Sequence, residues 1–414
     1  MADNKENRIP NVPHLRFPEF AGEWEKCKVS DLLDFYSTNS LSWEQLEYDT
    51  NAMMNLHYGL IHVGLSTMVD LAKDKLPNIK GDNMPKNFEL CKEGDVAFAD
   101  ASEDTNEVAK AIEFYNLASK NVVCGLHTIH GRDNKSKTVM GFKGYAFSST
   151  AFHNQIRQIA QGTKIYSIST KNFSECYIGL PSKPEQTKIA TLLRLIDERI
   201  ATQNKIIEKL ESLIKGLSQR LLFPKQGWTS YRLDELCQIK SGFSGTQVSL
   251  QTAYKVSRIE TISKHYIDMS RTGYVRDIPQ EYKLNAGDIL FSNINSVQYI
   301  GNTAFIDKDY GLYHGMNLLR IIPYSNIVFP RFIHLLLCTD RLLRHFQSVC
   351  NKAVSQASIN QTSLGKTIMS IPSYGEQQHI CRIIGAVERK LDIETNLLET
   401  LQHQKHYLLR QMFI

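Results

Sequence analysis

Residues Pro184 to Phe223 decide the fold and read PEQTKIATLLRLIDERIATQNKIIEKLESLIKGLSQRLLF. Apolar residues follow one another here in alternating steps of four and three, and only Gln203 interrupts the series. A period of 3.5 residues sustained over this length is typical of a coiled-coil helix. Pro184 suits a first helical turn, and Pro224 stops the helix. The apolar seam consists of Ile189, Leu193, Ile196, Ile200, Ile207, Leu210, Ile214, Leu217 and Leu221.

The same pattern returns at the end of the chain, with the offset of 191 residues that separates Pro181 from Pro372. A repeat of this kind has to be interpreted before anything else, because it sets the architecture. The sequence predicts a globular segment followed by a long helix, twice. The offset pairs Glu185-Gln186 with Glu376-Gln377, Ile189 with Ile380, Leu210 with Leu401, Leu217 with Leu408, and Gln203 with Glu394.

The predicted fold class is α+β, with two mixed α/β domains joined by two long helices. Because the second helix must return the chain that the first carries away, the helices are predicted to form an antiparallel coiled coil with an internal pseudo-two-fold repeat. The segment Leu15 to Trp24 resembles Leu221 to Trp228, so the N-terminus is expected to lie where the second helix ends. The predicted parts are an N-terminal segment (1–23), a first domain (24–183), a first helix (184–223), a second domain (224–373) and a second helix (374–414).

Composition indicates an ordinary folded protein that leans basic, with 42% hydrophobic residues, 22% charged residues and a net charge of +5. That charge favours nucleic acid only weakly. The eight cysteines include no CxxC pair, so neither a zinc knuckle nor a disulfide framework is predicted, and a reduced cytoplasmic protein is expected. No apolar stretch is long enough for a membrane span.

No catalytic motif is present: HExxH and GxSxG are missing, and Ser363 to Thr367 lacks the first glycine of a phosphate-binding loop. The sequence therefore predicts no enzyme, no metal and no cofactor. Polar and basic loop residues remain, of the types that read base edges and hold phosphates, although such residues also cap turns. The predicted DNA-binding residues are Tyr58, His62, His127, Arg132 and Lys135 in the first domain, and Lys240, Arg258, Asn293, Asn295, Ser296, His314 and Asn317 in the second.

The doubled helix motif resembles the specificity subunits of type I restriction-modification systems. The residues that carry the resemblance are Leu180 to Ala190 with Ile196 to Ile200, their copy Ile371 to Ile380, the Gly94-Asp95 and Gly287-Asp288 strands, and the segments Gly125 to Thr128 and His314 to Asn317. The resemblance implies two target recognition domains, each reading one half of a bipartite, asymmetric site in double-stranded DNA. It also implies two methyltransferase subunits docked on the helices, restriction-translocase subunits outside them, and a bacterial or archaeal cytoplasm.

Other functions remain open at this point. A stand-alone bipartite DNA-binding regulator would bind its site tightly without partner subunits. A coiled-coil scaffold without a nucleic-acid partner would show no salt-dependent DNA binding. A self-contained methyltransferase or nuclease is disfavoured by the missing motifs.

Overall fold

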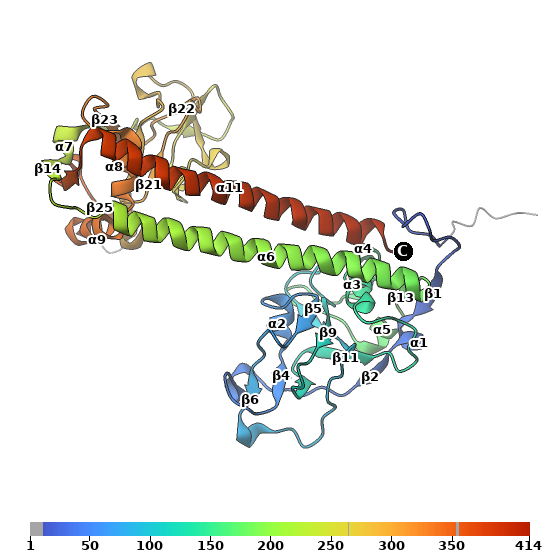
Figure 1. The fold of residues 1–414 in the computed structure, drawn as a ribbon. Coiled ribbons are helices and arrows are strands. Elements are labelled where there is room, and N and C mark those ends of the chain that lie inside the picture. Colours follow the sequence, from blue (N-terminus) through green and yellow to red (C-terminus); the bar gives the residue numbers. More distant parts are fainter. Residues whose placement is uncertain (1–10, 264, 353–355) are drawn as a thin grey trace, which may run out of the picture. The chain divides into compact units, whose positions relative to one another are not determined.

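The computed structural model describes residues 11–263, 265–352 and 356–414, so part of the predicted N-terminal segment lies outside the described residues. The chain forms two compact units, one comprising the chain up to Lys205 with Asn396–Ile414, and the other Ile206–Thr395. Helices α6 (Lys183–Leu221) and α11 (Tyr374–Gln411) are the two long helices that the 3.5-residue period predicts (Figure 1). Each unit contains the start of one long helix and the end of the other, as the predicted antiparallel pair requires.

Unit 1 is built on two sheets. The larger one has the order β2-β11-β7-β9-β5, with only the β5–β9 pair parallel, and the smaller one has the order β10-β4-β6-β3, with β10 parallel to β4. Strands of the larger sheet are β2 (Asp34–Tyr36), β11 (Thr128–Arg132), β7 (Val96–Ala99), β9 (Ala111–Asn116) and β5 (Met68–Asp70). Strands of the smaller sheet are β10 (Val122–Cys124), β4 (Met54–Leu56), β6 (Asn78–Ile79) and β3 (Leu46–Glu47).

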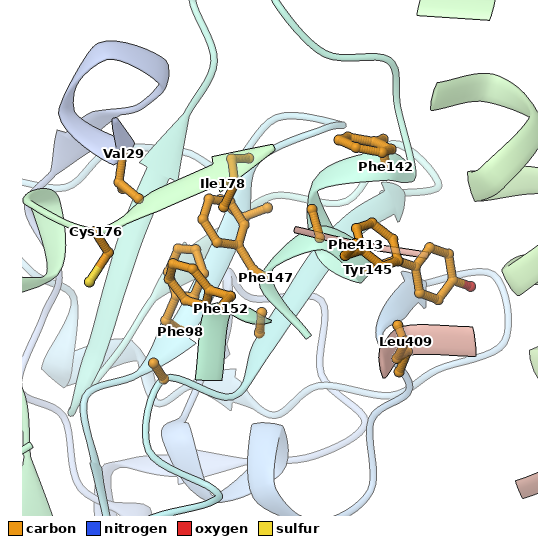
Figure 2. Packing of buried hydrophobic residues seen from close by; sticks show 14 of the residues in the cluster. Val29, Phe98, Phe142, Tyr145, Phe147, Phe152, Cys176, Ile178, Leu409 and Phe413 are labelled. Atoms are coloured by element: carbon orange, nitrogen blue, oxygen red, sulfur yellow. The ribbon is translucent and has the colours of Figure 1, made fainter. Parts of the chain in front are cut away.

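Short strand pairs and helices complete unit 1. The pairs are β1 (Glu25–Lys28) with β13 (Tyr177–Leu180) and β8 (Ala101–Ser102) with β12 (Tyr166–Ser167). The α-helices before α6 are α1 (Val29–Leu32), α2 (Tyr58–His62), α3 (Phe142–Phe147), α4 (Thr150–Ile159) and α5 (Thr170–Ser174). The main core lies where α3 and α4 cover the larger sheet, and Figure 2 shows Phe98 and Phe147 packed there. Their ring centroids lie 4.9 Å apart, edge to face.

The two ends of the described chain meet inside unit 1, so the N-terminal segment lies where the second long helix ends, as predicted. Leu15 donates its backbone N–H to the carbonyl of Gln411 at 2.9 Å. The Phe413 ring, 6% exposed, lies in the same core as Phe142 (Figure 2), and it packs edge to face on Trp24 with ring centroids 6.4 Å apart. Residues after α11 therefore belong to the core of unit 1.

Unit 2 repeats this plan. Its larger sheet, fully antiparallel, has the order β15-β23-β19-β21, and its second sheet has the order β16-β18-β17-β22, with β17 parallel to β22. Strands of the larger sheet are β15 (Cys237–Ser241), β23 (Leu318–Pro323), β19 (Ile289–Ser292) and β21 (Thr303–Phe305). Strands of the second sheet are β16 (Gln247–Val248), β18 (Gly273–Val275), β17 (Tyr254–Val256) and β22 (Leu312–Tyr313).

The remaining elements of unit 2 frame its core, which α8 covers. The other strands are β14 (Thr229–Arg232), paired with β26 (Ile368–Ile371), and β20 (Ile294–Asn295), β25 (Ala357–Ser358) and β24 (Asn351–Lys352) in a small sheet. The α-helices are α7 (Leu233–Leu236), α8 (Pro330–Leu337), α9 (Asp340–Val349) and α10 (Gln361–Gly365). Trp228 packs on Phe332 with ring centroids 6.0 Å apart, so the second tryptophan of the repeat is partly buried against the core of unit 2.

The repeated glutamine at the start of each long helix fastens the helix to its unit. Gln186 accepts a hydrogen bond from the backbone N–H of Val139 at 2.9 Å, and its amide donates to the carbonyl of Pro181 at 3.0 Å. Gln377 makes the same pair of bonds to Phe329 and Pro372, at 2.8 and 3.0 Å. Both glutamines are buried. Since buried polar groups need such partners, the repeated motif is explained by packing.

The polar residues of the predicted seam are buried or form ion pairs. Lys405, which stands where the first helix has Ile214, forms an ion pair with Asp197 at 2.6 Å within unit 1. Gln203 and Glu394 are both buried, and Glu394 forms an ion pair with Lys390 one turn earlier on α11. Among the described residues, no helix is both long and apolar enough to cross a membrane.

Candidate nucleic-acid interface

In unit 2 three strands bring most of the predicted DNA-binding residues to one edge of the larger sheet. The register pairs Ser241 with Leu319 and Ser292 with Leu318, so the end of β15, the start of β23 and the end of β19 coincide. Lys240 lies at the first of these ends, Asn317 immediately precedes the second, and residues 293–296 follow the third. The side chains of Lys240 and Asn317 are exposed.

Backbone hydrogen bonds between neighbouring loops bring Arg258 to this edge. Gly315 donates its N–H to Ser257 Oγ at 3.0 Å, and Phe243 donates its N–H to the carbonyl of His314 at 3.0 Å. These contacts hold the residue after Ser257 beside the turn that precedes β23. The Arg258 side chain is 46% exposed, and its Nε lies 3.6 Å from Glu260 at the surface, so its guanidinium can reach a phosphate only in competition with this carboxylate.

The three polar residues after β19 are half-buried and held by local hydrogen bonds. Asn295 Nδ2 donates to Ser292 Oγ at 3.2 Å, and its Oδ1 accepts from the N–H of Ser296 at 2.8 Å. Asn293 Nδ2 lies 3.4 Å from the carbonyl of Ile359, and its Oδ1 is buried without a hydrogen-bond partner in the described structure. The edge therefore presents amides that the fold has already oriented.

Unit 1 forms an equivalent edge from the ends of β2 and β7 and the start of β11. The residue before β11 is His127 and the residue before β23 is Asn317, and both adopt left-handed backbone conformations, with φ of 53° and 63°. The same turn therefore presents an imidazole in one unit and an amide in the other. His127 Nδ1 lies 3.0 Å from Asp100 Oδ1, and its side chain is 50% exposed.

Aromatic rings gather around His127. The Tyr58 ring lies 5.2 Å from that of His127 and 5.9 Å from that of His62, measured between centroids. His57 stacks on Trp43 at 4.4 Å, and burial lowers the pKa of His57. The structure thus joins three predicted residues, Tyr58, His62 and His127, into one cluster. Sequence reasoning missed Trp43 and His57, because both are ordinary loop residues until the fold stacks them.

Two predicted residues of unit 1 lie elsewhere. Arg132 is the last residue of β11, at the end opposite to His127, and Lys135 follows this strand, where its Nζ donates to the carbonyl of Asp31 at 3.0 Å. Arg132 is 7% exposed, and its Nε and Nη2 donate to the two oxygens of Asp95 at 2.8 Å each. Its side chain therefore holds strands together within the fold rather than facing solvent.

His314 of unit 2 is buried as well. Its Nε2 lies 2.9 Å from the carbonyl of Leu318, and burial lowers its pKa to about 4. A neutral imidazole at this position supports the turn that carries Asn317.

In each unit a buried aspartate that immediately precedes a central strand, Asp95 before β7 and Asp288 before β19, pairs with an arginine. Gly94 and Gly287, with φ of 87° and 97°, make the turns that place Asp95 and Asp288 in their sheets. Burial would raise the pKa of Asp95, but hydrogen bonds from His130 and Arg132 hold it below its usual value. Burial raises the pKa of Asp288, and a single ion pair at 2.6 Å, from Arg320, opposes the shift.

Comparison with known proteins gives the same organisation. A family model described as type I restriction modification DNA specificity domain matches residues 73–212 and 225–403. The chain is 17% identical to the type I restriction-modification S subunit from M. genitalium, with a TM-score of 0.60 over 97% of this chain and 99% of that one. A chain solved in work on assembly of the type I R-M system gives a TM-score of 0.58 at 15% identity, over 93% and 96% of the two chains. These solved structures share the fold.

Curated relatives match over shorter stretches. The MjaX type I restriction enzyme specificity subunit of Methanocaldococcus jannaschii is 34% identical over 45% of this chain and 46% of its own length. The HindI specificity subunit of Haemophilus influenzae is 28% identical over 34% and 31%, and the EcoKI specificity subunit of Escherichia coli is 19% identical over 58% and 57%. The matches thus cover between about a third and three fifths of these relatives. With two family-model matches that together cover most of its residues, the chain belongs to the type I restriction modification DNA specificity family.

Proposed function

We propose that the chain is the DNA-recognition subunit of a type I restriction-modification complex in the cytoplasm, and that each unit reads one half of a bipartite, asymmetric site in double-stranded DNA. It performs no catalysis itself in this proposal. Methyl transfer belongs to two methyltransferase subunits docked on the long helices, and translocation and cleavage belong to restriction subunits outside them.

One observation carries the proposal: the two units present different side chains from the same turn. His127 and Asn317 precede equivalent strands in the same backbone conformation, at edges where polar residues of several loops converge. Amides and imidazoles are groups that discriminate base edges, whereas Lys240 and Arg258 suit phosphate contacts. Two units with the same fold but different base-contacting side chains can recognise the two different halves of an asymmetric site.

Exposed apolar residues on the long helices support docking of partner subunits. Leu195 and Leu213 on α6 are 53% and 48% exposed, and Ile393 and Tyr407 on α11 are 60% and 56% exposed. Large apolar groups on helices that are otherwise polar outside are typical of protein interfaces. Replacing Leu195 and Ile393 by Glu is expected to abolish copurification of the methyltransferase subunit, and Thr202→Glu on the same helix is the control.

The decisive experiment is sequencing of the methylome in cells that express the chain with its methyltransferase subunit. A bipartite, asymmetric methylated motif is expected. His127→Ala should relax one half of that motif and Asn317→Ala the other, while Lys26→Ala, an exposed lysine of β1 at the Arg132 end of the sheet, should change neither. A palindromic motif, or loss of both halves from one substitution, would contradict the proposal.

Binding measurements separate the stand-alone regulator from the specificity subunit. The regulator would bind its site with the same affinity whether or not the methyltransferase subunit is added. The specificity subunit should gain affinity when that subunit is present, because the assembled complex adds contacts with the DNA backbone.

A further inference from the structure

Unit 1 contains a buried group of two thiols and one imidazole that DNA recognition does not use. Cys91 Sγ and Cys124 Sγ lie 3.6 Å apart, and a ring nitrogen of His130 lies within 4.8 Å of both. These side chains are 6%, 1% and 0% exposed. We propose that Cys91, Cys124 and His130 bind a thiophilic divalent cation of the zinc class.

The histidine is oriented for this role. Its Nε2 lies 2.7 Å from Asp95 Oδ2, and an ionised carboxylate can only accept, so the proton of the neutral imidazole lies on Nε2. Nδ1 then carries the lone pair, and it is buried without a hydrogen-bond partner in the described structure. A carboxylate that fixes one imidazole nitrogen while the other faces the ligand group is the usual arrangement behind a metal-binding histidine.

The carboxylate is itself held in place. Arg132 donates to both oxygens of Asp95, and the backbone N–H of Lys92 donates to Oδ2 at 2.9 Å. Asp95 therefore has no freedom to turn toward the thiols, and it acts as the support of His130 rather than as a ligand. Arg132 also forms an ion pair with Glu89 at 2.6 Å, so this group of charges has no excess positive charge that could balance two thiolates.

Distance and charge both select a zinc-class ion. Two thiolates at 2.3 Å from one tetrahedral ion lie about 3.8 Å apart, close to the separation of Cys91 and Cys124. Two thiolates and a neutral imidazole carry two negative charges, which a divalent ion cancels. A monovalent ion would leave a net charge in a buried position, which is costly. Three protein donors leave the fourth tetrahedral position to a water molecule or small anion.

The repeat supplies an internal comparison. Cys91 donates its N–H to Val122 O, as Leu284 does to Leu312 O, so the two positions are equivalent. By the same registers Cys124 corresponds to His314, and His130 to Arg320. Unit 2 thus has leucine, histidine and arginine where unit 1 has three soft donors. The proposed site belongs to unit 1 alone.

The ion would stiffen the turn that presents His127. Cys124 ends β10 and His130 lies in β11, so the two ligands bracket the turn between these strands. Cys91 adds the loop that leads to β7. Binding would therefore fix the candidate reading edge of unit 1, and the test below measures the ion itself rather than DNA recognition.

The experiment measures metal in the full-length protein purified without chelator. Elemental analysis should find one zinc-class ion per chain, falling below about a tenth in Cys91→Ser and Cys124→Ser and unchanged in Cys176→Ser, a buried cysteine of the same unit. Reconstitution with Co²⁺ should produce a thiolate-to-cobalt charge-transfer absorption that both site variants lose.

Misfolding of the variants is controlled with the native protein. A chelator should remove the ion from the unmodified chain with an unchanged circular dichroism spectrum, and added Zn²⁺ should restore one ion per chain. Folded protein that holds no ion after incubation with Zn²⁺ and removal of the excess would overturn the proposal. Retention of metal by both site variants, or stoichiometric cuprous copper in place of a divalent ion, would overturn it as well.

Discussion

Replacing Phe413 by alanine tests whether the last residues of the chain are part of the core of unit 1. The Phe413 side chain is 6% exposed, and its ring packs on Trp24 and on Phe142, with centroids 6.4 and 5.9 Å apart. Truncation of a buried phenylalanine costs about 3–5 kcal/mol through lost burial and the cavity left behind. Because Phe413 is 6% exposed and its surroundings can relax, we expect the lower value, about 3 kcal/mol.

For a unit of this size, about 1 kcal/mol corresponds to roughly 2–4 °C, so the melting temperature of unit 1 should fall by about 6–12 °C. Hydrogen exchange followed by mass spectrometry reports on each unit separately. Peptides of β7 and β11 in unit 1 should exchange faster, and those of β19 and β23 in unit 2 should not change. Tyr407→Ala is the matched control, because this aromatic residue of α11 is 56% exposed, and its loss should stay within about 0.5 kcal/mol. Equal stabilities of the two variants would refute the placement of the chain end.

Four further outcomes follow from the structure and the proposed function. Exchanging residues 24–182 for those of another family member should change one half of the methylated motif, and a change in both halves would contradict modular reading. Lys240→Ala should weaken binding to all DNA sequences about equally and reduce the salt slope by about one, as measured by titration at several salt concentrations. Inserting seven residues after Gln203 and after Glu394 keeps the seam in phase and lengthens each helix by about 10 Å. The gap between the two halves of the methylated motif should therefore grow by about three base pairs. An active variant with an unchanged gap would contradict the idea that the helices set the spacing. Burial lowers the pKa of His314 to about 4 and that of His334 to about 3, whereas the same histidines in the unfolded chain take up protons near pH 6.5. The free energy of unfolding should therefore fall as the solution is acidified below pH 6.5, by up to about 2 kcal/mol per histidine at pH 5. Urea unfolding at pH 7 and pH 5 measures this difference, and His314→Gln should make it smaller.

The long helices and the repeat could be predicted from the sequence because both depend on periodicity, which is local. The seam from Ile189 to Leu221 predicts a helix over residues 184–223, and the structure has α6 over Lys183–Leu221. The role of the repeated glutamine was not predictable, because Gln186 bonds to Val139, a residue 47 positions away. A contact between residues so far apart in the chain produces no regular spacing of residues in the sequence.

The candidate interface was predictable in kind but not in detail. Loop residues of the right type were identified, yet Arg132 proves to be buried against Asp95, 37 positions earlier in the chain. The soft donors Cys91, Cys124 and His130 likewise have no motif spacing, since a sheet and a loop bring them together. Sequence gives the chemical type of a side chain, and only the fold gives its partner.

The contact of Phe413 with Trp24 also determines when unit 1 can be finished during synthesis. The two residues are separated by nearly the whole chain, and translation at about 5–20 residues per second needs roughly 20–80 s to cover that interval. Unit 2 ends at Thr395, so all of its residues leave the ribosome first. The domain made first is thus completed last, and until Leu408, Leu409, Met412 and Phe413 have been synthesised it must persist with an open core surface where these residues will pack. A nascent chain in this state is a natural client for a chaperone that shields apolar surface.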